Sequence, residues 1–295
     1  MSRISAKNVT CVIPYAGAER YISEAIGSAL AQNFWEVIIV NDGFPAAQLE
    51  AFAKLSRIRL IHLPKPVGCP KARNVGINAC ATDYIVFLDH DDLLRSGYWD
   101  AMSAWMSERN LRCAAATLHY IGENSSRVGV IVSRHPDFFM PSGFLAEVSL
   151  VREVGMFPDS LSDDLLFFRS VRRLTELTTC PTAGVLYRIH PKAESSQNTK
   201  AWWAFNQLLP LYDAGVRQLS EINAIAKDFA VNGVVPPGLE QELSGSEPAV
   251  VRLFSRSAYA CWLNRDFQGV FRNAARLLRY FPQLLALARR KWTKT

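Results

Sequence analysis

The chain changes abruptly from apolar to acidic over residues 84–92, which read Tyr-Ile-Val-Phe-Leu-Asp-His-Asp-Asp. Residues 84–88 are apolar or aromatic, as expected of a short strand that is buried on both faces. Three carboxylates follow within the next four residues. A buried strand that ends in such a cluster predicts an α/β fold with a polar site at the carboxyl ends of its strands.

Two earlier apolar runs also end in small or polar residues. Residues 9–14 are followed by Tyr-Ala-Gly, and residues 36–40 are followed by Asn-Asp-Gly. Parallel strands present their carboxyl ends at one edge of a sheet, where ligands bind in open α/β folds. We therefore expect these three strand ends to form one active site.

The first half of the chain alternates such runs with amphipathic stretches, which indicates βαβ units and a mostly parallel sheet flanked by helices. Beyond residue 200 the strand pattern gives out and the chain becomes helical. The expected organisation is an α/β domain over residues 1–200 and a helical extension over residues 201–295. Further strands are predicted at 58–63, 114–119, 128–132 and 184–189, and helices at 18–30, 46–54, 70–79, 97–108 and 162–174.

Composition and cysteine spacing exclude several classes of protein. The 295 residues are 49% hydrophobic and 20% charged, as in a globular protein with a sizeable core. No apolar run approaches the length of a transmembrane helix, and residues 1–10 lack the apolar core of a signal peptide. The six cysteines include no C-x-x-C pair, so we expect free thiols in a reducing cytoplasm.

Basic charge gathers near the C-terminus. The net charge is +6, but from Arg265 onward eight basic residues stand against one acid, so the rest of the chain is close to neutral. A nucleic-acid-binding surface on the main body is therefore not indicated. Residues 267–291 intersperse apolar residues with arginines, which fits either an interfacial helix on an anionic membrane or a helix packed on the body.

The acidic cluster at residues 89–92 has two interpretations. Neighbouring carboxylates repel one another unless a cation lies among them, and oxygen ligands of this kind suit Mg²⁺ or Mn²⁺. Alternatively, the cluster is a solvated turn that caps the helix beginning near Ser96.

Four motifs in order make the chain resemble the family 2 glycosyltransferases of the GT-A fold. They are V-I-P-Y at 12–15, E-V-I-I-V-N-D-G at 36–43, G-x-x-x-A-R-N-x-G at 68–76 and the stretch 84–92. The resemblance implies a nucleotide-diphosphate sugar as donor and a D-x-D motif of Asp89 and Asp91. In it, Asp91 holds Mn²⁺ or Mg²⁺ and Asp42 recognises the nucleobase. The donor site that it implies comprises Pro14, Tyr15, Asp42, Lys71, Arg73, Asp89 and His90.

Two later segments extend the resemblance to about residue 196. Asp163 and Asp164 resemble the family's acidic pair, whose second member is the catalytic base, although aspartates in this position also stabilise a helix N-terminus. His190 resembles a histidine near the metal and diphosphate, although a lone histidine at a strand end is often structural. Supporting or acceptor-side roles are expected for Asp163, Gly143 and Arg169, and the loop 135–143 is a candidate acceptor wall.

The chain departs from the family pattern at several positions, and the resemblance also implies which type of sugar transfer to expect. Asn41 and Asp163 replace an aspartate and a glutamate that are usual in the family, and Tyr15-Ala-Gly lacks a common asparagine. The motif of processive synthases is absent, so we expect transfer of a single sugar from a UDP-sugar, with inversion. A glycan or lipid-linked acceptor in cell-surface synthesis and a cytoplasmic, peripheral location are expected. The alternative is a non-catalytic nucleotide-sugar-binding or scaffold protein.

Overall fold

The computed structural model describes residues 4–17, 19–45, 47–122, 128–132, 139–191, 199–233, 235–236, 238–243 and 249. The chain divides into two compact units. One comprises Met1–Asp159 and Asp163–Pro191, and the other comprises Ser160–Ser162 and Lys192–Thr295. The boundary expected near residue 200 stays a prediction.

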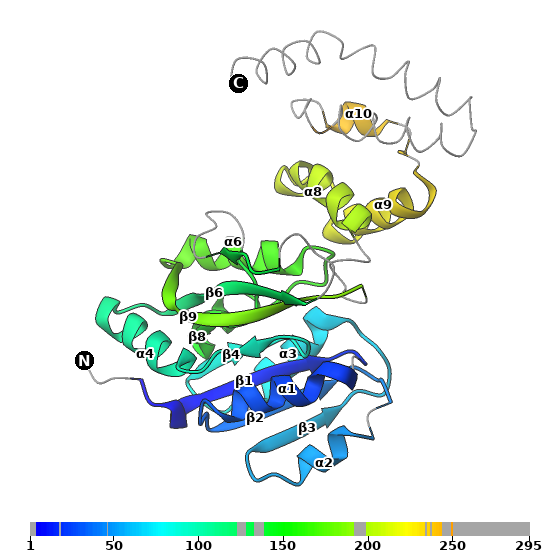
Figure 1. Cartoon of the computed structure of the whole chain (residues 1–295). Coiled ribbons are helices and arrows are strands. Elements are labelled where there is room, and N and C mark those ends of the chain that lie inside the picture. Colours follow the sequence, from blue (N-terminus) through cyan, green and yellow to red (C-terminus); the bar gives the residue numbers. More distant parts are fainter. Residues whose placement is uncertain are drawn as a thin grey trace. The chain divides into compact units, whose positions relative to one another are not determined.

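In the described residues of the first unit, nine strands form one sheet (Figure 1). Its order is β3-β2-β1-β4-β8-β6-β9-β5, and β7 pairs with β6. The first four strands are parallel, and so are β6 and β9, whereas the other four pairings are antiparallel. The strands are β1 Val9–Tyr15, β2 Glu36–Asn41, β3 Ile58–His62, β4 Tyr84–Phe87, β5 Leu93–Leu94, β6 Cys113–Gly122, β7 Ile131–Val132, β8 Leu145–Glu147 and β9 Thr178–Ile189.

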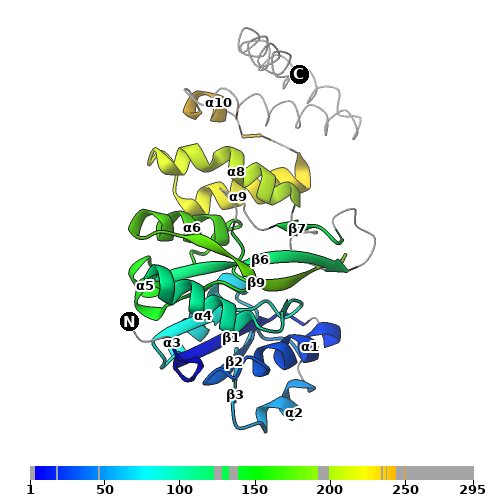
Figure 2. The same cartoon turned by 60° about the vertical axis from the view of Figure 1, so that its left-hand side comes forward.

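Helices pack on both faces of this sheet (Figure 2). Alternate residues of β1 enter different core layers, with Cys11 and Ile13 on one face and Val12 on the other. The first layer contains residues of α1, α2 and α4, and the second contains residues of α3, α5 and α6. These helices are α1 Glu19–Leu30, α2 Leu49–Ala53, α3 Cys69–Ala79, α4 Tyr98–Arg109, α5 Val148–Glu153 and α6 Asp163–Leu174, and a 3₁₀ turn η1 spans Ala6–Asn8.

Helix α3 lies unusually close to β1 because of a glycine. A methyl group added at Gly76 would collide with the side chain of Val12. Pro70 lies in the first turn of α3, where a missing N–H costs nothing. From the same helix, Arg73 reaches Asp89, which follows β4.

The sheet differs from the sequence prediction mainly in its second half. The strand predicted at 184–189 begins earlier, at Thr178. The prediction missed its first part because Pro181 interrupts the strand pattern in the sequence. In the structure Pro181 lies at an irregularity of the β6–β9 pairing, where a proline is tolerated. Only Ile131–Val132 of the strand predicted at 128–132 is strand, α2 is shorter than predicted, and β8 and α5 were not predicted.

The described part of the second unit is mainly helical. It contains α8 Thr199–Asp213, α9 Leu219–Asn232 and α10 Leu239–Glu242. Helices α8 and α9 pack against each other, with the rings of Trp203 and Phe229 6.0 Å apart. None of the helices in the described ranges combines the length and the apolar character needed to span a bilayer. The basic segment 267–291 lies outside the described residues.

Candidate active site

The acidic turn 89–92 follows β4 and is anchored to the segment that precedes β8. The N–H of Asp89 donates to the hydroxyl of Ser142 at 3.0 Å, and the N–H of Gly143 donates to the carbonyl of Phe87 at 2.8 Å. Gly143 has φ +74°, and a methyl group there would collide with Val185. Gly143 thus lies beside the turn in a conformation and a space that favour glycine.

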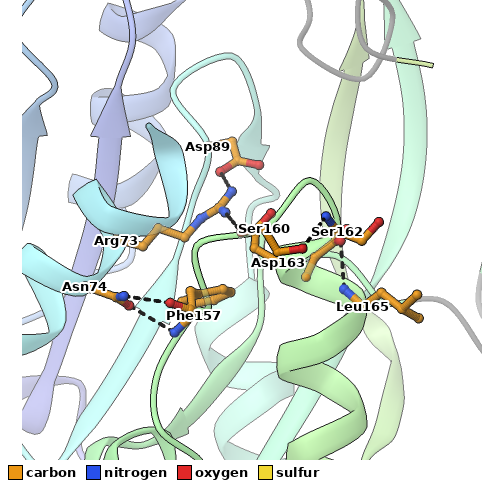
Figure 3. Close-up of polar contacts among 9 residues, drawn as sticks. Arg73, Asn74, Asp89, Phe157, Ser160, Ser162, Asp163 and Leu165 are labelled. Carbon is orange, nitrogen blue, oxygen red and sulfur yellow. Dashed lines mark hydrogen bonds and ion pairs between the residues drawn. The ribbon is translucent and has the colours of Figure 1, made fainter. Parts of the chain in front are cut away.

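Arg73 joins the acidic turn to the first turn of α6. Its guanidinium Nη2 is 2.6 Å from Oδ1 of Asp89, and its Nη1 is 3.0 Å from Oδ2 of Asp163 (Figure 3). Arg73 is buried, and its guanidinium carbon lies 5.2 Å from the ring centroid of Phe157. Burial lowers the pKa of Arg73, but the charges of Asp89, Cys69 and Asp163 more than offset this and hold it well above its usual value. Arg73 is therefore a permanent cation between two carboxylates.

Asn74, the next residue of α3, holds the segment that leads toward α6. Its Nδ2 donates to the carbonyl of Phe157 at 2.7 Å, and its Oδ1 accepts from the N–H of Phe157 at 3.0 Å (Figure 3). The side chain thus satisfies both main-chain groups of one residue. This contact keeps the Phe157 ring beside Arg73.

Asp164 lies in the first turn of α6, next to Asp163. Its Oδ1 accepts from the N–H of Leu165 at 2.7 Å. Burial raises the pKa of the Asp164 carboxyl, and the hydrogen bond from Leu165 and the charge of Arg73 partly offset the rise. A carboxylate with a raised pKa is a stronger base than an exposed one, as a general base requires.

The structure brings Asp91 and His190 together from segments 99 residues apart. Oδ2 of Asp91 is 2.9 Å from Nε2 of His190, and both side chains are largely buried. Neighbouring ligands around Mg²⁺ or Mn²⁺, at metal distances of about 2.1 Å, lie about 3 Å apart. Within the described ranges, no group of three or more His, Cys, Asp or Glu side chains is arranged so that it could hold a metal ion by itself. The pair therefore fits two positions of a coordination shell, and water and diphosphate oxygens would have to complete it.

Asp92, the last residue of the turn, is held to β9 through one of its two carboxylate oxygens. It is buried, and its Oδ1 accepts from the main-chain N–H of Arg188 at 2.8 Å. Burial raises its pKa well above the usual value, and the nearby charges of Asp91 and Asp89 add to the rise. Sequence reasoning did not separate Asp92 from its neighbours, because only the tertiary pairing with β9 distinguishes it.

Asp42 binds the main chain of the segment before α3. Its two carboxylate oxygens accept from the N–H groups of Val67 at 2.7 Å and Gly68 at 2.9 Å. The side chain of the adjacent Asn41 stabilises the turn after β2. Its Nδ2 donates to the carbonyl of Phe44, and its Oδ1 accepts from the N–H of Phe44. Recognition of a nucleobase by Asp42 stays a prediction.

The end of β1 contacts the acidic turn through His90. The carbonyl of Pro14 is 3.1 Å from Nδ1 of His90, and the Tyr15 and His90 rings lie edge to face with centroids 5.7 Å apart. Lys71 is half-exposed and forms an ion pair with Asp159 at 2.6 Å. Arg169 lies on α6 and is partly buried.

Some of the predicted residues thus contact one another around the acidic turn, whereas Asp42 and Lys71 have their described partners elsewhere. Arg73 connects Asp89 with Asp163, Asp91 meets His190, and His90 meets Pro14. Of the loop 135–143, residues 135–138 lie outside the described residues.

Comparisons with known proteins agree on one family. The family model described as Glycosyl transferase family 2 matches residues 10–149. The glycosyltransferase EpsJ of Bacillus subtilis is 36% identical over 35% of this chain and 31% of its own length. A glycosyltransferase of Haemophilus influenzae is 28% identical over 35% of this chain and 44% of its own length. The matches thus span less than half the length of these relatives.

Solved structures show the same fold. A structure of S. aureus TarS in complex with UDP-GlcNAc has a TM-score of 0.54 and 16% identity, covering 94% of this chain and 92% of that one. The complex of TarS with UDP has the same TM-score and 17% identity, covering 94% of this chain and 91% of that one. At this identity the likeness shows the fold, which is the expected α/β GT-A fold with a sheet flanked by helices.

Proposed function

We propose that the chain moves one sugar from a nucleotide-diphosphate sugar onto an acceptor hydroxyl, because the family model of glycosyl transferase family 2 matches residues 10–149. The observation that carries the proposal is the Arg73 bridge, with Asp89 at 2.6 Å and Asp163 at 3.0 Å. The bridge brings the acidic turn of the proposed donor site next to the helix turn with the proposed base.

The proposed donor is a UDP-sugar, with a hexosyl or N-acetylhexosaminyl group. Support comes from the fold shared with TarS, whose structures contain UDP and UDP-GlcNAc. The residues proposed to surround the donor are Pro14, Tyr15, Asp42, Lys71, Arg73, Asp89 and His90. Pro14 and Tyr15 lie at the end of β1, Asp42 follows β2, Asp89 and His90 follow β4, and Lys71 and Arg73 lie in α3.

Asp91 and His190 are the residues that would hold a divalent cation. Carboxylates suit Mg²⁺ and Mn²⁺, whereas imidazole is typically a ligand of transition metals, so the pair favours Mn²⁺. When bound, such an ion stabilises the negative charge of the diphosphate as a Lewis acid.

Asp164 is proposed as the general base. It takes the proton of the acceptor hydroxyl while the oxygen forms a bond to the anomeric carbon and the bond to the diphosphate breaks. One such displacement inverts the anomeric configuration. A positioned base typically contributes about 10²–10⁴-fold to the rate. Asp163, held by Arg73, would keep the first turn of α6 in place for this step, and Gly143 and Arg169 are proposed on the acceptor side.

The acceptor class is also a proposal. A glycan or a lipid-linked oligosaccharide in cell-surface synthesis suits a family 2 transferase that has a basic C-terminal segment. Attraction of that segment to an anionic membrane would place the enzyme peripherally on the cytoplasmic face.

The test is release of UDP from a panel of UDP-sugars and acceptors in the presence of Mn²⁺. Wild type should release UDP, and Asp164→Asn should lower turnover by about 10²-fold or more while UDP affinity is retained. Equal turnover by Asp164→Asn would reject the assigned base. Donor binding without turnover over all acceptors would favour the non-catalytic alternative.

A further inference from the structure

Arg188, near the end of β9, contacts the acidic turn through both its main chain and its side chain. Its main-chain N–H donates to Oδ1 of Asp92 at 2.8 Å, and its Nε donates to the carbonyl of Asp91 at 2.9 Å. Its Nη2 is 2.8 Å from Oε2 of Glu24 in α1. The guanidinium therefore joins three segments that are distant in sequence.

His190 follows directly after β9, two residues beyond Arg188. Its Nε2 lies 2.9 Å from Oδ2 of Asp91, so it also contacts the acidic turn. The ring of Tyr21 in α1 supports both residues, with its centroid 4.3 Å from the Arg188 guanidinium carbon and 5.0 Å from the His190 ring centroid. The end of β9 and the residue that follows it thus contact both the main chain of Asp91, through Arg188, and its carboxylate, through His190.

We propose that Arg188 is a positioning residue that keeps the Asp91 carboxylate at the correct distance from His190 for both to bind one divalent cation. This inference rests on the proposed function of that pair. Arg188 acts on the main chain of the ligand residue and needs no contact with the ion. Its planar fork of donors aims Nε at the turn and Nη2 at Glu24, which the single ammonium of a lysine cannot reproduce.

The expected effect is a loss of metal affinity. Groups that orient metal ligands typically change metal affinity by about 10–100-fold when they are replaced. Arg188→Met and Arg188→Lys should both weaken Mn²⁺ binding by about this factor. The affinity for UDP without metal should stay unchanged, because the contacts described for Arg188 are to Asp91, Asp92, Glu24 and Tyr21, which are not among the residues proposed to surround the donor.

The experiment is a direct Mn²⁺ titration of the full chain, in which electron paramagnetic resonance counts free Mn²⁺, followed by UDP calorimetry with and without Mn²⁺. Arg112→Lys is the matched control, because Arg112 also bridges two acids, Glu147 at 2.8 Å and Glu153 at 3.1 Å. Glu147 pairs with Tyr84 at the start of β4, whereas the acidic turn follows the end of that strand. Arg112→Lys should therefore leave Mn²⁺ affinity as in wild type.

The outcomes separate this inference from the proposed function. If wild type binds Mn²⁺ and both Arg188 variants bind it within about threefold of wild type, the role of Arg188 is overturned and the proposed function stands. If wild type binds neither Mn²⁺ nor UDP, the proposed function fails and this inference fails with it. If Arg188→Met does not fold, Arg188→Lys decides the matter, with its fold checked by circular dichroism.

Discussion

Replacing Arg73 by methionine removes the cation of the bridge and keeps most of its side-chain volume. Arg73 is 7% exposed in its side chain, and its two partners are 19% and 17% exposed. With N–O distances of 2.6 and 3.0 Å, the charges are about 4 Å apart, and each attraction is worth about 4 kcal/mol at an effective dielectric constant near 20. Desolvation offsets much of this attraction.

Breaking a buried ion pair by removing one partner typically costs about 3–5 kcal/mol, because an uncompensated charge remains. Arg73→Met leaves two carboxylates, Asp89 and Asp163, near each other without their cation. We therefore expect its free energy of unfolding at pH 7 to fall by about 3–5 kcal/mol. Adding Asp163→Asn to this variant should restore part of the loss, because it removes one of the two repelling charges.

Urea unfolding followed by far-ultraviolet circular dichroism measures this change. Arg112→Met is the matched control, because Arg112 is 34% exposed and its ion pairs are better solvated. An exposed pair contributes about 0–1 kcal/mol, so the control should lose much less than Arg73→Met. A loss below about 1 kcal/mol for Arg73→Met, or equal losses for the two variants, would refute the reasoning.

Three further predictions concern the base, the loop beside the acidic turn and the α3 tether. Because burial raises the pKa of Asp164, kcat/KM should fall as pH drops through a pKa above the usual carboxyl value of about 3.9, and a pH–rate profile with no such limb would contradict this. Gly143→Ala should lower the free energy of unfolding by about 2–4 kcal/mol in urea titrations, because φ is +74° and the new methyl group would collide with Val185. An unchanged urea midpoint would count against the described position of Gly143 beside Val185. Asn74→Asp should cost about 1–3 kcal/mol by the same measurement, because the donor to the Phe157 carbonyl is lost, whereas stability equal to wild type would show that this bond contributes little.

The first half of the fold was predictable because its pattern is local. The runs 9–14, 36–40, 58–63 and 84–88 correspond to β1, β2, β3 and β4, and the acidic turn follows β4 as expected. Buried parallel strands read as continuous apolar runs, and their helices show the helical period. The free cysteines in the described ranges also agree with their irregular spacing.

The second half depends on contacts between distant segments. The pairing of β6 with β9 joins residues 64 positions apart, such as Ala114 and Thr178, and no local pattern indicates it. Strand β8 is only three residues long, which is too short for an alternating pattern to be recognised.

The candidate site shows the same limit. The residue types at Asp89, Asp91, Asp163 and His190 could be singled out from the sequence, through the acidic cluster and the family resemblance. The contacts that hold them could not. The resemblance placed Arg73 near the donor but did not indicate its bridge between Asp89 and Asp163, and Arg188 had no predicted role, because both arginines meet the acidic turn only in three dimensions. An arginine in a helix or at a strand end is most often a solvated residue, so its type alone indicates no role.

The measurement that tests the central claim most directly is a calorimetric titration of UDP with and without Mn²⁺, on wild type, Asp91→Asn and Asp83→Asn. Asp83 is the matched control, since it precedes β4 and accepts from Nδ2 of Asn8, while Asp91 follows the strand. We predict that Mn²⁺ strengthens UDP binding to wild type and to Asp83→Asn, and that Asp91→Asn loses this gain. Folded wild type that binds no UDP, or Asp91→Asn that keeps the full effect of Mn²⁺, would contradict the assignment of this site.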